Sequence, residues 1–312
     1  MNSNEHLIAR IVRQERGAWT ADLHGELRLI RRLAAPPQPV TGDWVELRPT
    51  LDGIVRVLPR RTVIARRAPD GRAAQILAAN ADLALIVMGL DGDYSLRRLE
   101  RYLAMAAGSG ARAAVLLNKR DLCADVPARA AAAKAIAGEA PVLPLCAQRD
   151  DAAALLEGLV REGETAVLLG SSGAGKSTLA NRLLGRELLA TAPVRQADSR
   201  GRHTTTARRL LPMPGGWSLI DLPGLREVGL LPGAADLAPL FPALETLASG
   251  CRFRDCTHTV EPGCAVRGAC GPDRLASYRK LKEETHAERQ RRAKQIARSL
   301  RAMQRMDGFN KW

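Results

Sequence analysis

The feature that most constrains this 312-residue chain is a glycine-rich segment, GSSGAGKST at 170–178. It follows the apolar run AVLL and precedes the helix-compatible run TLANRLLG, so it matches the pattern G-x-x-x-x-G-K-[ST] in the strand–loop–helix context that the pattern requires. Glycines let the backbone curl until successive N–H groups point at phosphate oxygens, and the start of the helix adds a positive dipole. The segment therefore predicts a phosphate-binding loop in an α/β fold.

Individual positions of this loop have distinct expected roles. We expect Lys176 to reach the β- and γ-phosphates and to act in catalysis, and Ser177 to bind Mg²⁺. The expected nucleotide contacts of the segment are Gly170, Ser171, Ser172, Gly173, Ala174, Gly175, Lys176, Ser177 and Thr178. The loop alone does not distinguish ATP from GTP.

The tetrapeptide NKRD at 118–121 supplies that distinction. It stands at the carboxyl end of a second apolar run, AVLL, where open α/β sheets place their ligand contacts. The carboxylate of Asp121 can accept both N–H groups on the N1 and N2 edge of guanine, whereas adenine has no such donor pair. Asn118 and the stem of Lys119 would pack around the base. The tetrapeptide and the phosphate loop together indicate a guanine nucleotide.

A third motif, DLPG at 221–224, follows the strand-like run WSLI. We expect Asp221 to join the Mg²⁺ shell and the N–H group of Gly224 to contact the γ-phosphate.

Two further segments complete the expected site. GRHTTT at 201–206 lies between the phosphate loop and DLPG, where a loop threonine must bind Mg²⁺; we favour Thr205, with Thr204 as the next candidate. Cys146 and Ala147 follow the run VLPL, at a place where a small backbone segment would contact the base.

The order of the motifs defines the domain. Apolar runs alternate with helical segments from about residue 80, at 95–107, 127–138, 151–161 and 176–185, which predicts parallel βαβ units in a doubly wound sheet. In an ordinary GTPase the guanine tetrapeptide comes last, but here it comes about fifty residues before the phosphate loop. The domain is therefore interpreted as circularly permuted, so that the turn at DLPG leads directly into the C-terminal region.

The two flanking regions have different patterns. Residues 1–68 contain short β-rich runs separated by turn formers, which predicts a small all-β barrel; a sandwich or an SH3-like barrel would give a similar pattern. Near the other end, Cys251, Cys256, His258 and Cys264 offer three thiolates and one imidazole, the soft tetrahedral set suited to one structural Zn²⁺ ion. Buried reduced cysteines are the alternative.

Charge and hydropathy indicate the compartment and the partner. The formal net charge of +14 predicts attraction to a polyanion such as RNA, although a coding bias toward arginine would give the same excess. Basic residues cluster toward the C-terminus, and the candidate phosphate contacts there are Arg289, Arg291, Arg292 and Lys294. A helix face in solvent is the alternative. The apolar runs are too short to span a bilayer, so we expect a cytoplasmic protein without membrane contacts.

Taken together, the permuted NKRD, GSSGAGKST, GRHTTT and DLPG motifs, the β-rich N-terminus and the Cys/His cluster resemble the bacterial ribosome small-subunit-dependent GTPase A family over nearly the full length. The resemblance implies an OB-fold at 1–68, a circularly permuted GTPase domain at 69–230 and a zinc-binding α-helical domain at 231–312. It also implies a monomer that uses GTP, GDP and Mg²⁺, contacts the small ribosomal subunit through its 16S rRNA, and acts in late subunit maturation, with other assembly factors as further candidate partners.

Hydrolysis is expected to be slow without a partner. Leu225 follows DLPG, where many GTPases have the glutamine that positions the attacking water. His203 is the candidate replacement, because a neutral imidazole can accept a hydrogen bond from water. The small subunit is expected to order the 201–206 loop and stimulate turnover. Two other functions stay open: an ATPase or kinase with a phosphate loop, and a passive RNA-binding scaffold that holds nucleotide.

Overall fold

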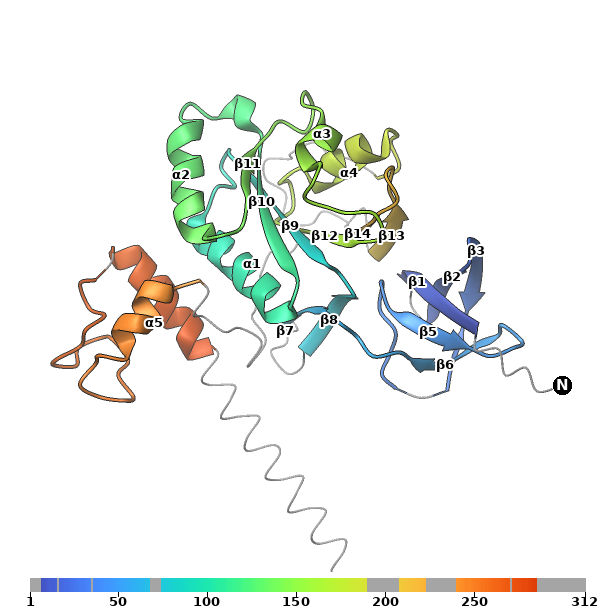
Figure 1. Ribbon diagram of the computed structural model, residues 1–312, viewed down its shortest axis with the longest axis horizontal. Coiled ribbons are helices and arrows are strands. Elements are labelled where there is room, and N and C mark those ends of the chain that lie inside the picture. Colours follow the sequence, from blue (N-terminus) through green and yellow to red (C-terminus); the bar gives the residue numbers. More distant parts are fainter. Residues whose placement is uncertain are drawn as a thin grey trace, which may run out of the picture. The chain divides into compact units, whose positions relative to one another are not determined.

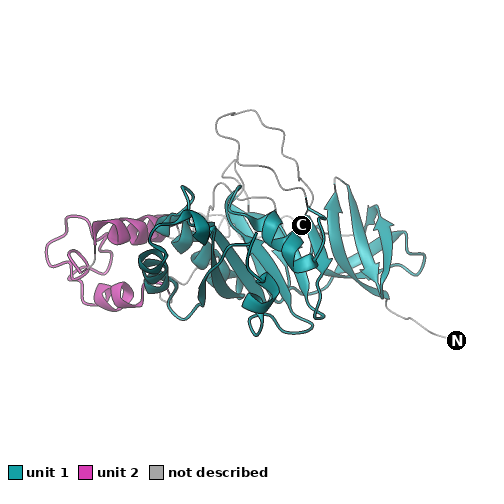
Figure 2. Cartoon of the chain, turned by 90° about the horizontal axis from the view of Figure 1, so that it is seen from above, with its two compact units in different colours: residues 1–229 teal, residues 230–312 magenta. Residues whose placement is uncertain are grey.

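The structure is a computed structural model, and it describes residues 7–15, 17–34, 36–67, 74–189, 208–222, 240–269 and 271–284. The chain forms two compact units, Met1–Gly229 and Leu230–Trp312 (Figure 2). Each has its own buried side chains, and each is described separately below.

The described residues of the N-terminal β region of the first unit form six strands around a core of their own. The strands are β1 (Leu7–Glu15), β2 (Ala18–Leu23), β3 (Glu26–Ile30), β4 (Arg32–Leu33), β5 (Trp44–Leu47) and β6 (Gly53–Val57). Alternate residues point inward, as the two-residue period of a strand requires, and the buried set includes Ile11, Ile30, Val45 and Ile54. Strands β2 and β3 form a hairpin whose tip is His24 and Gly25, both with positive φ angles.

Strand β1 joins this region to the second half of the unit. It pairs with β2 and β5, and it also pairs antiparallel with β13 (Arg208–Pro212), in the register Arg13 to Arg209. A hairpin of β7 (Val63–Arg67) and β8 (Ala74–Ala79) stands between the two halves in sequence.

The predicted α/β sheet is present. Its parallel strands are β9 (Leu83–Gly89), β10 (Arg112–Asn118), β11 (Val142–Pro144), β12 (Thr165–Leu169) and β14 (Ser218–Asp221), in the spatial order β11-β10-β9-β12-β14, with β13 antiparallel at the end (Figure 1). From β9 the chain moves first to one side, to β10, and later to the other side, to β12. The strand order therefore reverses between β9 and β12, and ligands of open α/β sheets bind at such a point.

Helices cover both faces of the sheet. They are α1 (Leu96–Ser109), α2 (Val126–Ala137), α3 (Ala152–Leu156) and α4 (Lys176–Leu184), with a short 3-10 helix, η1 (Arg120–Leu122). α1 packs against α2, and α3 against α4. Every residue of β9 is buried, as expected for a strand covered on both faces. The predicted helix at 151–161 is shorter, because Glu157 has an extended ψ angle and Gly158 a positive φ.

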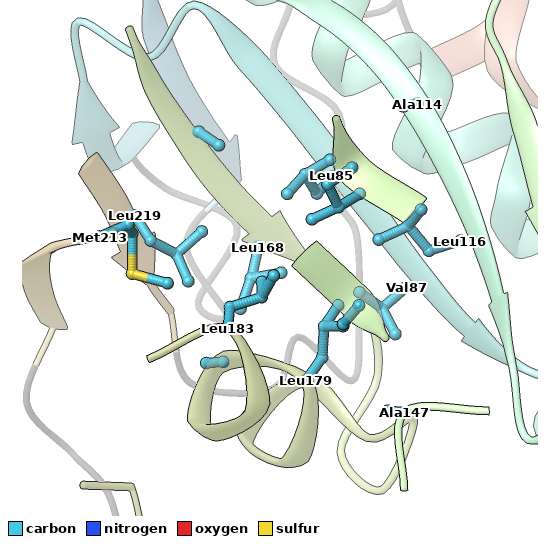
Figure 3. Close-up of a cluster of buried hydrophobic side chains, with 14 of the residues drawn as sticks. Leu85, Val87, Ala114, Leu116, Ala147, Leu168, Leu179, Leu183, Met213 and Leu219 are labelled. Atoms are coloured by element: carbon cyan, nitrogen blue, oxygen red, sulfur yellow. The ribbon is translucent and has the colours of Figure 1, made fainter. Parts of the chain in front are cut away.

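The core beneath α3 and α4 fixes the sheet edge that carries the motifs. Leu85, Val87 and Leu168 point from the sheet toward Leu179 and Leu183 of α4 (Figure 3). Because α4 begins at the last residues of the phosphate loop, this packing fixes the loop against the strand ends.

The second unit is small. Its described part contains α5 (Pro242–Ala248), a helix over 272–284 and the loops between them that hold the cysteines. Phe241, Leu244, Tyr278 and Leu281 are buried in it, and the rings of Phe241 and Tyr278 lie 5.2 Å apart. Among the described residues, no helix is both long and apolar enough to cross a membrane.

Candidate nucleotide site

The predicted phosphate loop runs from the end of β12 to the start of α4. Gly175 is the N-cap of α4 and has a φ angle of 98°, so the N–H groups of the first helical turn face the space in front of the loop. Lys176 is buried beneath the loop, and its Nζ donates to the carbonyl oxygens of Gly170 at 3.0 Å and Ser171 at 2.6 Å. Lys176 thus stabilises the conformation of the loop through two hydrogen bonds to its backbone.

Lys176 and Asp221 form the charged centre of the site. Burial lowers the pKa of Lys176 to about 8, an effect that the nearby carboxylates of Asp221 and Asp93 oppose. Burial raises the pKa of Asp221 to about 6, which Lys176 and Arg209 oppose. A polyphosphate with Mg²⁺ would supply the charge that each group lacks, because it brings anions to the lysine and a cation to the carboxylate.

Asn118 connects the guanine tetrapeptide to the phosphate loop. Its Nδ2 donates to the carbonyl oxygen of Ala174 at 2.9 Å, and its Oδ1 accepts from the N–H group of Ala147 at 2.9 Å. The approach is close, since a Cβ on Gly175 would lie 2.1 Å from Nδ2 of Asn118. One amide therefore joins three of the predicted segments at the carboxyl ends of β10, β11 and β12.

The other members of the tetrapeptide face different ways. Lys119 has a left-handed backbone conformation, and its Nζ lies 2.6 Å from Oδ2 of Asp91. Asp121 is exposed, and a hydrogen bond from the Cys146 side chain holds the pKa of its carboxyl below the usual value. The Asp121 carboxylate is thus ionised and open to solvent next to the Cys146–Ala147 segment.

Some residues that shape this site have no motif of their own. Asp150 accepts the N–H group of Cys146 at 2.7 Å and pairs with Arg120 at 2.7 Å, which fixes the 146–150 turn. Asp91 and Asp93, in the loop after β9, contact Lys119 and Ser171. Sequence reasoning missed all three, although the carboxyl end of the apolar run 83–89 indicates the same sheet edge as the motifs.

The predicted Cys/His group of the second unit also comes together. One ligand atom from each of Cys251, Cys256, His258 and Cys264 lies within 4.8 Å of the others. Nδ1 of His258 is 3.6 Å from the sulfur of Cys251 and 3.5 Å from that of Cys264. Usual zinc bond lengths in a tetrahedron place a nitrogen and a sulfur ligand about 3.6 Å apart. The donor set and its spacing therefore fit Zn²⁺, with Nδ1 as the nitrogen ligand.

Several predicted residues lie outside the described part of the chain. They are His203, Thr204 and Thr205 of the threonine loop, Gly224 of DLPG, and the C-terminal candidates Arg289, Arg291, Arg292 and Lys294.

The fold and the site define the chain as a nucleotide-binding protein with a phosphate loop and a permuted motif order. The model of the RsgA GTPase family matches residues 57–231, more than half of the chain. A protein of Opitutus terrae, "Small ribosomal subunit biogenesis GTPase RsgA", is 44% identical and covers 97% of this chain and 91% of its own length. The chain belongs to the RsgA GTPase family, as the sequence motifs predicted.

Solved structures agree on the fold. YjeQ from Thermotoga maritima has a TM-score of 0.62 at 22% identity and covers 90% of this chain and 98% of its own. YloQ, described as a circularly permuted GTPase, has a TM-score of 0.59 at 19% identity and covers 93% of this chain and 99% of its own. The permuted α/β fold is thus confirmed.

Proposed function

We propose that this protein binds GTP with Mg²⁺, hydrolyses it to GDP and phosphate, and acts in small ribosomal subunit biogenesis, as the name of its Opitutus relative states for that protein. One observation carries the nucleotide part of the proposal. Asn118 hydrogen-bonds both the phosphate loop and the segment after β11, so the base-reading and phosphate-binding segments meet at one edge of one sheet.

The proposed contacts follow from the chemistry of each group. Asp121 accepts the two guanine N–H donors, while the stem of Lys119 and the Cys146–Ala147 backbone pack against the base. The N–H groups of the phosphate loop and Lys176 bind the phosphates. Ser177, Asp221 and Thr205 hold Mg²⁺, with Thr204 as the alternative, and Gly224 contacts the γ-phosphate.

For the chemical step, we propose that His203 positions the attacking water, since Leu225 stands where a glutamine would otherwise do so. Slow turnover alone and fast turnover with the small subunit are the expected consequences. Replacement of His203 by alanine should abolish that stimulation while leaving GTP affinity unchanged; a fully stimulated variant would exclude the role.

The proposed partner is the small subunit, contacted through 16S rRNA. The net charge of +14 favours a polyanionic partner, and the N-terminal β region is proposed to be an OB-fold that contacts RNA. The Cys251, Cys256, His258 and Cys264 group is proposed to hold one structural Zn²⁺. All four positions of a tetrahedral ion are then occupied by protein, so a catalytic zinc is not expected. We propose that the protein is a cytoplasmic monomer.

Base selection can be tested by replacing the carboxylate of Asp121 with an amide. In Asp121→Asn, the amide can accept from N1–H of xanthine and donate to its 2-oxo group, but it cannot accept both donors of guanine. We expect wild-type protein to prefer GDP over ADP and XDP, and the variant to prefer XDP, in equilibrium titrations with fluorescent nucleotides. An unchanged preference for GDP in the variant would remove Asp121 from the base site, and equal ADP and GDP binding in the wild type would favour an ATPase or kinase.

Single-turnover hydrolysis separates an enzyme from a passive scaffold. GTP cleavage should be slow for the protein alone and strongly accelerated by purified small subunits, with large subunits as the matched control. Equal rates in all three conditions would contradict the subunit-dependent mechanism, and equally slow rates would support a scaffold.

A further inference from the structure

The loop after β9 carries two carboxylates that none of the nucleotide motifs includes. It spans residues 90–95 and begins with LDGD at 90–93. It stands at the carboxyl end of β9, between the strands that lead into the guanine tetrapeptide and the phosphate loop. Its two aspartates, Asp91 and Asp93, contact one of these motifs each.

Asp93 contacts the phosphate loop. Its Oδ1 accepts a hydrogen bond from Oγ of Ser171, the second residue of that loop, at 2.6 Å, and it is also paired with the guanidinium of Arg98. Its Oδ2 accepts from the N–H group of Gly89 at 3.2 Å. The carboxylate is thus fixed from the strand and the helix α1 side, and Ser171 is held by an anchored acceptor.

Asp91 contacts the guanine tetrapeptide. Its Oδ2 lies 2.6 Å from Nζ of Lys119, and its Oδ1 accepts from the N–H group of Asp93 at 3.1 Å. Partial burial of Asp91 alone would raise the pKa of its carboxyl, but the hydrogen bonds from Lys119 and from the backbone of Asp93 outweigh burial and lower it. Asp91 is therefore ionised at neutral pH and forms a charged pair with Lys119.

We propose that Asp91 and Asp93 are positioning residues that hold the two nucleotide loops in their binding conformation, Asp91 through Lys119 on the base side and Asp93 through Ser171 on the phosphate side. Both carboxylates belong to one four-residue segment of the loop after β9, so the spacing between base and phosphate contacts is set before nucleotide binds. Ordering of loops costs free energy at binding, and a preformed site avoids that cost.

Asp93 also has an effect that opposes nucleotide binding. The carboxylate is close enough to raise the pKa of Lys176, so it also adds negative charge near the place proposed for the phosphates. The pairing with Arg98 offsets that charge. If repulsion dominated, loss of Asp93 would tighten nucleotide binding, whereas positioning predicts that its loss weakens binding.

The inference rests on the proposed guanine site. Its test uses the full chain and measures GDP affinity with Mg²⁺ present. Asp91→Ala and Asp93→Ala should each weaken GDP binding roughly tenfold, the usual effect of a lost hydrogen bond to a charged group. Asp93→Asn keeps an oxygen that can accept from Ser171 and should retain most of the affinity. Glu139→Ala, at an exposed position between α2 and β11, is the matched control and should bind like wild type.

Double substitutions show whether each aspartate acts through its proposed partner. Lys119→Met removes the ammonium group that pairs with Asp91 but keeps a stem that can pack against the base. Ser171→Ala added to Asp93→Ala, or Lys119→Met added to Asp91→Ala, should cause little further loss, while Lys119→Met added to Asp93→Ala should multiply the two losses. Independent losses within either proposed pair, tighter binding by Asp93→Ala, or wild-type affinity of both alanine variants would overturn the inference. Failure of wild-type protein to prefer GDP over ADP would instead overturn the proposed function, and the inference with it.

Discussion

Lys176 and Asp221 are opposite charges whose burial disfavours the ionised form of both. The cost of burying these charges is partly offset, because Lys176 has two carbonyl acceptors and Asp221 lies near Lys176 and Arg209. The described residues thus compensate the charge of each group only in part. A buried charge that is only partly compensated favours binding of a ligand that completes it, and here the complementary ligand is an anion bound together with a divalent cation.

Acidic pH should therefore weaken Mg²⁺-dependent binding. Asp221 has a pKa raised from 3.8 to about 6, so its carboxyl binds a proton more readily in the folded state than in the unfolded chain. The contribution of Asp221 to folding stability therefore falls as the pH rises from 3.8 to about 6. Mg²⁺ needs the ionised form. We expect GDP affinity with Mg²⁺ to drop as pH falls below about 6, up to about tenfold per pH unit.

A matched variant distinguishes the titration of Asp221 from that of the nucleotide, because a phosphate group also takes up a proton near pH 6. Asp221→Asn keeps the nucleotide's own titration and loses that of the carboxyl. Titrations from pH 5 to pH 8 should show a shallower dependence in the variant, whereas identical slopes would mean that Asp221 is not the titrating ligand.

Strand β13 connects the nucleotide sheet with the N-terminal β region. One edge of β13 pairs with β14, in the register Arg209 to Asp221, and the other edge pairs with β1. It directly follows the segment that contains the threonine loop in sequence. In sequence, β13 lies between two nucleotide motifs, and in the sheet it pairs with β1. The position of β1 therefore depends on the position of β13.

The loop that leads into β5 is held by a buried ion pair. Asp43 is fully buried and accepts two hydrogen bonds from Arg60, at 2.8 and 2.7 Å, and one from the N–H group of Val40 at 2.8 Å. Asp43→Ala would leave the guanidinium of Arg60, which is only 12% exposed, without this partner. We expect a loss of about 3 to 5 kcal/mol in the free energy of unfolding.

The exposed pair of Arg32 and Asp52 in the same β region provides the control. Asp52→Ala should change little, because water replaces an exposed partner. Chemical denaturation of both variants measures the difference. Similar losses in the two variants would show that burial of the Asp43 pair does not decide its contribution.

What the sequence could predict depends on how local each signal is. The runs at 112–118, 165–169 and 218–221 are each apolar over a strand length and end at a motif, so the same local pattern predicts the strand, the sheet edge where it ends and the site residues there. The pairing of β1 with β13 joins residues nearly two hundred positions apart and leaves no local pattern. Asp91 and Asp93 were missed for a similar reason, since their partners Lys119 and Ser171 are brought to them only by the sheet.

The two units are stabilised by different means. The first unit buries continuous strands between helices. The second has few buried apolar residues in its described part, and its cysteine loop has no extended apolar core. Small folds of this kind depend on metal or disulfides, and no disulfide joins the described cysteines. We therefore expect Zn²⁺ to supply much of the second unit's stability.

This difference predicts two unfolding transitions that respond to different ligands. GDP with Mg²⁺ at about one hundred times its dissociation constant should stabilise the first unit by roughly 2.7 kcal/mol. A zinc-selective chelator, with Mg²⁺ kept constant, should unfold the second unit and leave the GDP-sensitive transition in place. Calorimetry can follow both, and protease cleavage within 240–284 identifies which unit has opened. Cys256→Ser should reproduce the effect of the chelator without added chelator. One transition that shifts with both ligands would mean that the two units unfold together, and a chelator without effect would remove the metal from the account of stability.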